Sequence, residues 1–426
     1  VSRSPRPAQG ESGPGSAERP ARPAHSSALR GPRPTKHTGG GSAPRPGRPR
    51  RPAPARPPMG DATRPVYLVQ TQPGLGALAW SEMSTALRKP TVLAQRHVPQ
   101  KDDVTLLQTA SPTKELFDLR TVEDVFVLAV RAFNIAPTAN GLKQIHTTVK
   151  QSPMVSSALN TYTAAGNRLP KITNFRVITR ATGRQEYPRK AIGEAVADAI
   201  RDSWPGRWRL VEEDADVEVW VTLFASELVV ALRLSDATMR HRGPDGGREV
   251  NRPAALRPVI AAAMVRLTDP QADDVFLDPM AGTGTLVAER AIAGPFDRLI
   301  AGDKSREAVK ALTKNLQTVG GDLAIRRLDA EDLPFADGEI SKIAVNLPFG
   351  KQVNHPDELT MLYQGAFREW VRVVRPGGLI VALASDIDRV REVMRLFPEL
   401  RVRGNYAIGV LGQAATILLI ERKNSS

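Results

Sequence analysis

Two short loops hold the residues whose types and spacing could do chemistry. Residues 278–286 read DPMAGTGTL, and residues 346–350 read NLPFG. Glycines in a strand-to-helix turn let a nucleotide-like cofactor approach the backbone, next to the unpaired N–H groups that open a helix. An amide, a proline and an aromatic ring on one loop suit a flat base that carries an amine. Together the loops predict methyl transfer to a nucleobase nitrogen.

The first loop follows a predicted strand that ends at Leu277. A dinucleotide fingerprint would need a third Gly or Ala at position 287, where Val287 stands. Carboxylates follow three successive predicted strands and therefore belong at one edge of a sheet, where doubly wound folds bind ligands. We expect S-adenosylmethionine there, held by Asp278, Pro279, Gly282, Thr283, Gly284, Thr285, Asp303, Asp329, Ala330 and Asn346.

Each of the three acids has an expected role. Asp303 is placed to accept from both ribose hydroxyls, Asp329 from the adenine amine, and Asp278 is placed to hold the ammonium of a methionine moiety. Any one of them alone is better read as a loop or helix-cap carboxylate. Their arrangement after successive strands favours the cofactor site.

The second loop is the predicted catalytic set of Asn346, Leu347, Pro348 and Phe349. The Asn346 side-chain oxygen and the Leu347 carbonyl can accept from an exocyclic amine and turn its lone pair toward the methyl group. Pro348 stiffens the loop, and Phe349 offers a face for base stacking, typically ~1–3 kcal/mol. The alternative is a plain turn with a core phenylalanine.

Composition separates a tail from the rest of the 426 residues. Residues 1–58 hold twelve Lys or Arg against two Glu, so they carry +10 of the net +14, and fourteen of the 35 prolines. We expect residues 1–62 to be disordered. This tail is either an RNA-tethering arm or the translation of a region upstream of a start at Met59. The chain has no cysteine, its longest apolar runs fall short of a membrane span, and its histidines lack ligand spacing, which predicts a cytoplasmic protein without a metal.

Hydrophobic patterning predicts three folded regions. Residues 63–168 read as an α+β, ferredoxin-like unit, with helices at 122–130 and 141–160. Residues 169–242 read as a second unit, with a helix at 189–203 and paired strands at 217–224 and 228–234. Residues 250–424 alternate strands and helices, which is typical of an α/β, doubly wound, Rossmann-like domain.

These loops resemble the class I, Rossmann-like S-adenosylmethionine-dependent methyltransferases, and the VVRPGG turn at 373–378 is similar to that family's late-sheet turn. Residues 67–76, 175–184 and 234–243 resemble THUMP-containing RNA-modification enzymes. The likeness is greatest to THUMP-type guanine-N2 methyltransferases that act on position 6 of the tRNA acceptor stem. It implies that the ferredoxin-like and THUMP units bind the acceptor stem and the 3′ end. Leu347 departs from the family's usual first proline.

The resemblance implies a monomer that binds tRNA. The basic residues expected to contact RNA phosphates are Arg176, Arg180, Arg184, Arg189, Lys190 and Arg242. A solvated charged face is the alternative for each of them. Other functions left open are methylation of ribosomal RNA guanine or of DNA adenine-N6, a noncatalytic RNA-binding protein, and a dinucleotide oxidoreductase, which would leave the second loop unexplained.

Overall fold

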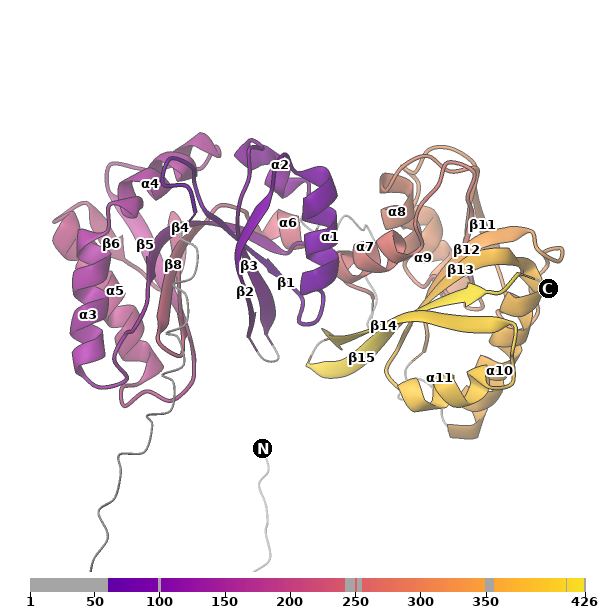
Figure 1. The fold of residues 1–426 in the computed structure, drawn as a ribbon. Helices are drawn as coiled ribbons and strands as arrows, with labels where there is room; N and C mark the ends of the chain where they lie inside the picture. Colours follow the sequence, from indigo (N-terminus) through magenta and orange to yellow (C-terminus); the bar gives the residue numbers. More distant parts are fainter. Residues whose placement is uncertain are drawn as a thin grey trace, which may run out of the picture. The chain divides into compact units, whose positions relative to one another are not determined.

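A computed structural model describes residues 60–98, 101–241, 250, 255–348, 356–410 and 412–424. Within them, strands β1–β8 form one sheet and strands β9–β15 form a second (Figure 1). The predicted disordered tail therefore lies outside the described residues, apart from its last three. No helix within the described ranges is long and apolar enough to cross a membrane.

The first sheet has eight strands in the order β2-β3-β1-β4-β8-β7-β5-β6. The strands are β1 (Tyr67–Thr71), β2 (Thr91–Val98), β3 (Asp102–Gln108), β4 (Asp124–Ala132), β5 (Thr173–Thr182), β6 (Trp208–Leu210), β7 (Val217–Phe224) and β8 (Glu227–Arg233). The helices are α1 (Gly76–Ala86), α2 (Thr113–Phe117), α3 (Asn140–Gln151), α4 (Met154–Ala164), α5 (Arg189–Ser203) and α6 (Ala237–His241). The predicted boundary at 168/169 falls between α4 and β5, and pairing of β4 with β8 continues the sheet across it.

The helix predicted at 122–130 is wrong, because this segment forms β4 in the middle of the first sheet. Eight of its nine residues are buried, so the strand packs on both faces and its sequence lacks the polar alternation of a half-buried strand. A short, continuously apolar run does not distinguish such a strand from a buried helix.

The single helix predicted at 141–160 is two helices, α3 and α4. Ser152 separates them with extended backbone angles (φ −70°, ψ 121°). Pro153 causes the break, because a proline ring disfavours helical geometry in the residue before it and lacks an N–H of its own.

The second sheet has the order β11-β10-β9-β12-β13-β15-β14. Its strands are β9 (Val275–Asp278), β10 (Arg298–Asp303), β11 (Leu323–Arg327), β12 (Ile340–Asn346), β13 (Val374–Ala384), β14 (Leu400–Val410) and β15 (Gln413–Arg422). The helices are α7 (Pro258–Leu267), α8 (Thr285–Ile292), α9 (Arg306–Asn315), α10 (Pro356–Val373) and α11 (Ile387–Met394). The first five strands in this order pair in parallel, which confirms the predicted α/β domain, and β15 and β14 add to it as antiparallel strands.

Two apolar cores cover the faces of this sheet. Residues of α7, α8 and α9 pack with one set of alternating strand residues, and residues of α10 and α11 pack with the other. The chain reverses direction across the sheet between β9 and β12, which are neighbours although β10 and β11 separate them in sequence. Doubly wound sheets bind ligands at the carboxyl ends of the strands at this switch point.

Candidate active site

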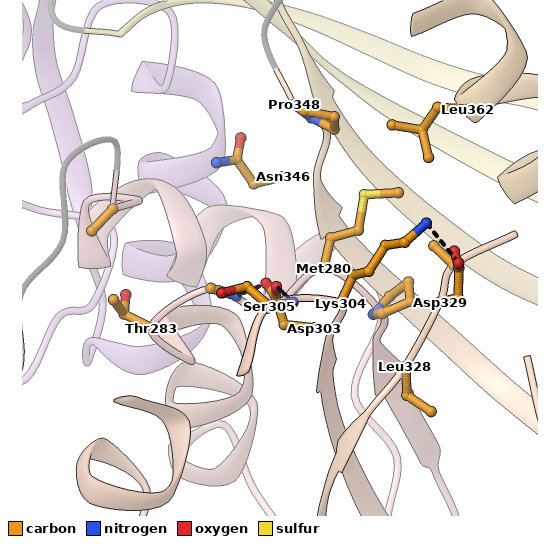
Figure 2. A pocket seen from close by; sticks show the side chains of 14 residues that line it. Met280, Thr283, Asp303, Lys304, Ser305, Leu328, Asp329, Asn346, Pro348 and Leu362 are labelled. Atoms are coloured by element: carbon orange, nitrogen blue, oxygen red, sulfur yellow. Dashed lines mark hydrogen bonds and ion pairs between the residues drawn. The ribbon is translucent and has the colours of Figure 1, made fainter. Parts of the chain in front are cut away.

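A cavity of about 610 Å³ opens at the carboxyl ends of β9, β10 and β12. Its lining joins segments that are far apart in the sequence: Ala255, Pro279, Met280, Gly282, Thr283, Asp303, Lys304, Ser305, Leu328, Asp329, Ala330, Asn346, Pro348 and Leu362. Figure 2 shows the side chains around it. The two loops singled out by the sequence thus meet in one cavity.

The glycine loop leaves backbone open toward this cavity. Gly282 has a φ of +56°, and no heavy atom lies within 4 Å of the position that a Cβ would take there. Gly284 has a φ of +86° and precedes α8 as its N-cap, with no side chain capping the helix. Gly282 and Thr283 line the cavity, whereas Gly284 and Thr285 are not among its lining residues. The first helical N–H groups are therefore available next to an uncovered turn.

Asp303 ends β10 and braces the glycine loop. Its Oδ2 accepts from the backbone N–H of Gly282 at 3.0 Å, and its Oδ1 accepts from that of Ser305 at 2.9 Å. A carboxylate has about four acceptor sites, so these two bonds leave capacity for ligand hydroxyls. Asp303 is half-buried and lines the cavity.

Asp329 lies across the cavity in an ion pair that the sequence did not predict. The Nζ of Lys304 is 2.7 Å from its Oδ2, shown as a dashed line in Figure 2. The hydrogen bond from Lys304 lowers the pKa of Asp329, and the same bond raises the pKa of Lys304. Asp329 therefore carries its charge at neutral pH and remains an acceptor. Lys304 follows Asp303 directly, but its reach to Asp329 depends on the pairing of β10 with β11.

Asp278 is buried and is not part of the wall of this cavity. Its side chain is 1% exposed, it is not a lining residue, and its Oδ1 accepts from the backbone N–H of Met280 at 3.2 Å. Burial, with the nearby charge of Asp303, raises the pKa of Asp278 well above the ordinary aspartate value. Its neighbour Pro279 and the neighbour of Asp329, Ala330, do line the cavity.

Asn346 is the last residue of β12, and its side-chain oxygen is the most informative atom of the site. Oδ1 is buried and has no hydrogen-bond partner among the described residues, although Asn346 lines the cavity. A buried acceptor without a partner costs about 1–3 kcal/mol, so native proteins rarely keep one without a use. The arrangement is ready for a donor that enters the cavity.

The other described residues of the second loop lie in two places: Leu347 in the core and Pro348 at the cavity. The Leu347 side chain is buried in the core, and its N–H donates to the Leu383 carbonyl at 3.0 Å. Pro348 lines the cavity, and its carbonyl accepts from the hydroxyl of Tyr363 at 2.9 Å. Phe349, predicted to stack on a base, lies outside the described residues. Tyr363, on α10, was missed because only the tertiary fold brings it to this loop.

The residues predicted to bind RNA fall into two groups. Arg176 pairs with Glu218, and Arg180 pairs with Asp102 while its guanidinium lies 4.5 Å from the centre of the Trp220 ring. Burial and the charge of Arg240 lower the pKa of Arg180 to about 10. The second group is exposed and consists of Arg184, Arg189 and Lys190, of which Lys190 pairs with Glu194 at 3.6 Å. Arg242 lies outside the described residues.

Comparison with known proteins finds a family match in the C-terminal part. Residues 245–412 match the family model described as the RMKL-like methyltransferase domain. The chain is 28% identical over 232 residues to the tRNA (guanine(6)-N(2))-methyltransferase THUMP3 of Bos taurus, covering 51% of this chain and 45% of that protein. It is 26% identical over 216 residues to the U6 snRNA (guanine-N(2))-methyltransferase THUMPD2 of Bos taurus, covering 50% and 41%. The matched region spans about half the length of these curated relatives.

Solved structures show the same fold. TrmN from Thermus thermophilus superposes with a TM-score of 0.67 at 21% identity, covering 84% of this chain and 99% of that one. The putative methyltransferase SMU.472, solved in complex with SAH, gives 0.58 at 13% identity, covering 85% and 100%. The chain therefore has the fold of these methyltransferases and is related in sequence to RNA guanine-N2 methyltransferases, which confirms that part of the resemblance.

Proposed function

We propose that this chain transfers a methyl group from S-adenosylmethionine to the exocyclic N2 of a guanosine in RNA, at position 6 of the tRNA acceptor stem. The observation that carries the proposal is the buried, unpartnered Oδ1 of Asn346 in the same cavity as the open glycine turn. An amine that enters the cavity can donate a hydrogen bond to this oxygen, which has no other partner among the described residues.

The cavity fits the cofactor. Gly282 leaves a side of the turn free of heavy atoms, Asp303 keeps spare acceptor capacity, and Asp329 is a charged acceptor on the wall. We propose that Gly282 and Thr283 approach the cofactor through their backbone, and that Asp303 and Asp329 accept from its hydroxyls and its amine. Gly284, Thr285 and Asp278 are buried and do not line the cavity, and we propose that they hold the shape of the turn. When bound, S-adenosylmethionine supplies a methyl group on a positively charged sulfur.

The target loop orients the amine. An exocyclic amine is a poor nucleophile because its lone pair is delocalised into the ring. We propose that Asn346 Oδ1 and the Leu347 carbonyl accept from its two N–H bonds and so direct the lone pair toward the methyl group. Pro348 limits the motion of the loop, and Phe349 stacks on the base. No side chain has to remove a proton before the new N–C bond forms, because the proton can leave from the charged product.

The first sheet is proposed to bind RNA. Residues 63–168 would be the ferredoxin-like unit and residues 169–242 the THUMP unit, acting in a cytoplasmic monomer. Arg184, Arg189 and Lys190 are exposed and placed to contact phosphates. Arg176 and Arg180 already have acidic partners, so their contribution depends on exchanging a carboxylate for a phosphate. Arg242 remains a proposed contact.

The deciding experiment is incubation of the purified chain with labelled S-adenosylmethionine and total RNA, followed by nucleoside mass spectrometry and mapping. N2-methylguanosine at position 6 of tRNA is the expected product. Label in another RNA, such as ribosomal RNA or U6 snRNA, would keep the chemistry and change the substrate. Label in DNA, or none in RNA at saturating cofactor, would overturn the proposal.

Replacing Asn346 with alanine should abolish turnover, because the amine loses its side-chain acceptor. S-adenosylmethionine binding, measured by calorimetry, should stay within about three-fold, since ~0.7 kcal/mol is the most that this change should cost a ligand held by other residues. Asn346→Asp keeps an acceptor and should retain part of the activity. An equal loss of turnover and of cofactor affinity in Asn346→Ala would assign Asn346 to the cofactor pocket instead.

A further inference from the structure

We propose that Tyr363 is a positioning residue that fixes the catalytic loop through the carbonyl of Pro348. The inference rests on the proposed function, because it assigns a role within that site. Tyr363 lies on α10, fifteen residues beyond Pro348, and is not a lining residue of the cavity. It therefore acts on the loop and does not touch cofactor or substrate.

Tyr363 is well suited to hold the loop in one place. Its side chain is fully buried in the core under the second sheet, where Phe367 and Trp370 of the same helix also pack. From this fixed ring the hydroxyl reaches the Pro348 carbonyl at 2.9 Å. A buried ring has little rotamer freedom, so the hydroxyl marks one point in space for that carbonyl.

The hydroxyl is a donor at every pH at which the chain would work. Burial, with the nearby charge of Asp386, raises the pKa of Tyr363 to about 12. Asp386 itself is held by Arg389, which also donates to Thr360 at 2.6 Å, and Thr360 lies one turn before Tyr363 on α10. This contact ties the helix that carries the tyrosine to α11.

The loop has a second fixed point, so Tyr363 completes a two-point attachment. Asn346 pairs with Leu383 in the sheet, and the Leu347 N–H donates to the Leu383 carbonyl at 3.0 Å. These contacts hold the start of the loop, and the Tyr363 bond holds the Pro348 carbonyl. The peptide between the two points includes the Leu347 carbonyl, one of the two proposed acceptors. Removing the hydroxyl frees one end of that peptide.

A second buried tyrosine provides a matched control. Tyr162 on α4 also donates to a backbone carbonyl, that of Asp216 at 2.6 Å, and its pKa is also raised to about 12, mainly by burial. It belongs to the core of the first sheet, whereas Leu347 and Tyr363 belong to a core of the second sheet. Tyr162→Phe and Tyr363→Phe therefore remove the same chemical group from the same kind of bond.

The test compares these two variants in steady-state kinetics and in hydrogen exchange. We expect Tyr363→Phe to lower kcat about 10- to 100-fold, the range expected for a misaligned reacting group, with KM for RNA and the cofactor Kd within two-fold. Tyr162→Phe should leave kcat within two-fold of the wild-type value. Both should lower Tm to a similar extent.

The exchange measurement does not depend on the proposed activity. The Leu347 amide is protected by the Leu383 carbonyl, and its exchange should become about ten times faster in Tyr363→Phe and stay unchanged in Tyr162→Phe. Unchanged exchange together with unchanged kcat would overturn the inference. Equal kcat losses in both variants would reduce Tyr363 to a packing role. Faster exchange in a chain whose wild type transfers no label would leave the positioning role standing and sink the proposed function instead.

Discussion

The three carboxylates that the sequence places at one edge of the second sheet differ in how deeply they are buried. Asp303 and Asp329 line the cavity, whereas Asp278 is 1% exposed and has its pKa raised well above the ordinary value. A buried carboxyl prefers its neutral form because the charged form loses its hydration. At the scale of single residues, Asp278 is therefore better explained as part of the framework under the glycine loop than as a ligand contact.

The raised pKa of Asp278 predicts how the stability of the fold changes with pH. Asp278 binds its proton more tightly in the folded chain than in the unfolded one, so the folded state loses stability as pH rises above the ordinary pKa of 3.8 toward the raised one. A neutral amide in its place could not ionise, so Asp278→Asn should have a higher Tm than the wild type at pH 8. The advantage should vanish near pH 4, as calorimetry at several pH values would show.

Asp329 supplies the opposite control. Its pKa is lowered by Lys304, so its charged form stabilises the fold above the unfolded pKa, and that stability is lost as pH falls through the lowered value. Asp329→Asn should thus have a lower Tm than the wild type at pH 8. A higher Tm for Asp329→Asn, or a lower one for Asp278→Asn, would contradict the assignment of the two acids.

At the scale of elements, the turn from β9 into α8 combines two glycines with different surroundings. A Cβ on Gly284 would lie 3.0 Å from Leu312 and 3.1 Å from Leu316, whereas a Cβ on Gly282 would meet no heavy atom within 4 Å. Both have positive φ, so both resist substitution by any residue with a side chain. Gly284 also lacks room for a side chain, because Leu312 of α9 and Leu316, the residue after α9, pack against it.

Gly284→Ala and Gly282→Ala should therefore separate stability from binding. Each substitution costs about 1–3 kcal/mol for its backbone conformation, and Gly284→Ala should lose more because the methyl group also displaces Leu312 and Leu316. Gly282→Ala places its methyl group toward the cavity and should weaken S-adenosylmethionine binding by about tenfold or more.

Chemical denaturation and calorimetry measure the two effects. Stronger destabilisation in Gly282→Ala than in Gly284→Ala would disagree with this account of the turn. Undiminished cofactor affinity in Gly282→Ala would mean that the ligand does not approach that side of the loop.

The elements also show what the sequence could predict. The alternation of strands and helices in the second sheet followed from patterning, because β9, β10 and β12 are short apolar runs that end at an acid or amide residue. β4 was mistaken for a helix because it is buried on both faces, and that burial depends on β1 and β8, which are its neighbours only in the folded sheet. Pro153 was visible in the sequence, and its effect on Ser152 is a local rule that predicts the break between α3 and α4.

In the candidate site too, features of local sequence could be predicted and contacts made by the tertiary fold could not. The two loops and two of the acids were found because each directly follows a strand, and strand ends of one sheet meet at one edge. Lys304 and Tyr363 could not be found this way. Their contacts with Asp329 and with Pro348 depend on the register of β10 with β11 and on how α10 packs under the sheet.

At the scale of the whole molecule, residues that are far apart in the sequence bring segments of the N-terminal and C-terminal halves into contact. The Gly409 N–H donates to the Pro73 carbonyl at 3.0 Å, Arg120 pairs with Glu289 at 2.8 Å, and Arg257 is 3.2 Å from Glu123. The contact at Pro73 is close because Gly74 follows it: with a φ of +91°, a Cβ there would overlap the Ala407 carbonyl oxygen.

Gly74→Ala should therefore disrupt this contact, and Gly166→Ala is its control. Gly166 has a similar φ of +94° but nothing within 4 Å of a Cβ, so its substitution has the same backbone cost of about 1–3 kcal/mol without a clash. Gly74→Ala should destabilise the chain by at least about 1 kcal/mol more than Gly166→Ala, because the carbonyl must move. Urea denaturation of both variants measures the difference. Equal losses of unfolding free energy in the two variants would show that the contact between the Pro73 turn and β14 does not stabilise the chain.

The pairing of β4 with β8 limits how this chain can be shortened. A fragment that ended at residue 168 would keep β4 but lose the strand beside it, and would expose a nine-residue row of backbone amides and carbonyls along an apolar strand. Such an edge recruits other chains, and the fragment would be prone to aggregate. A shortened chain would therefore have to keep or lose the eight-stranded sheet as a whole.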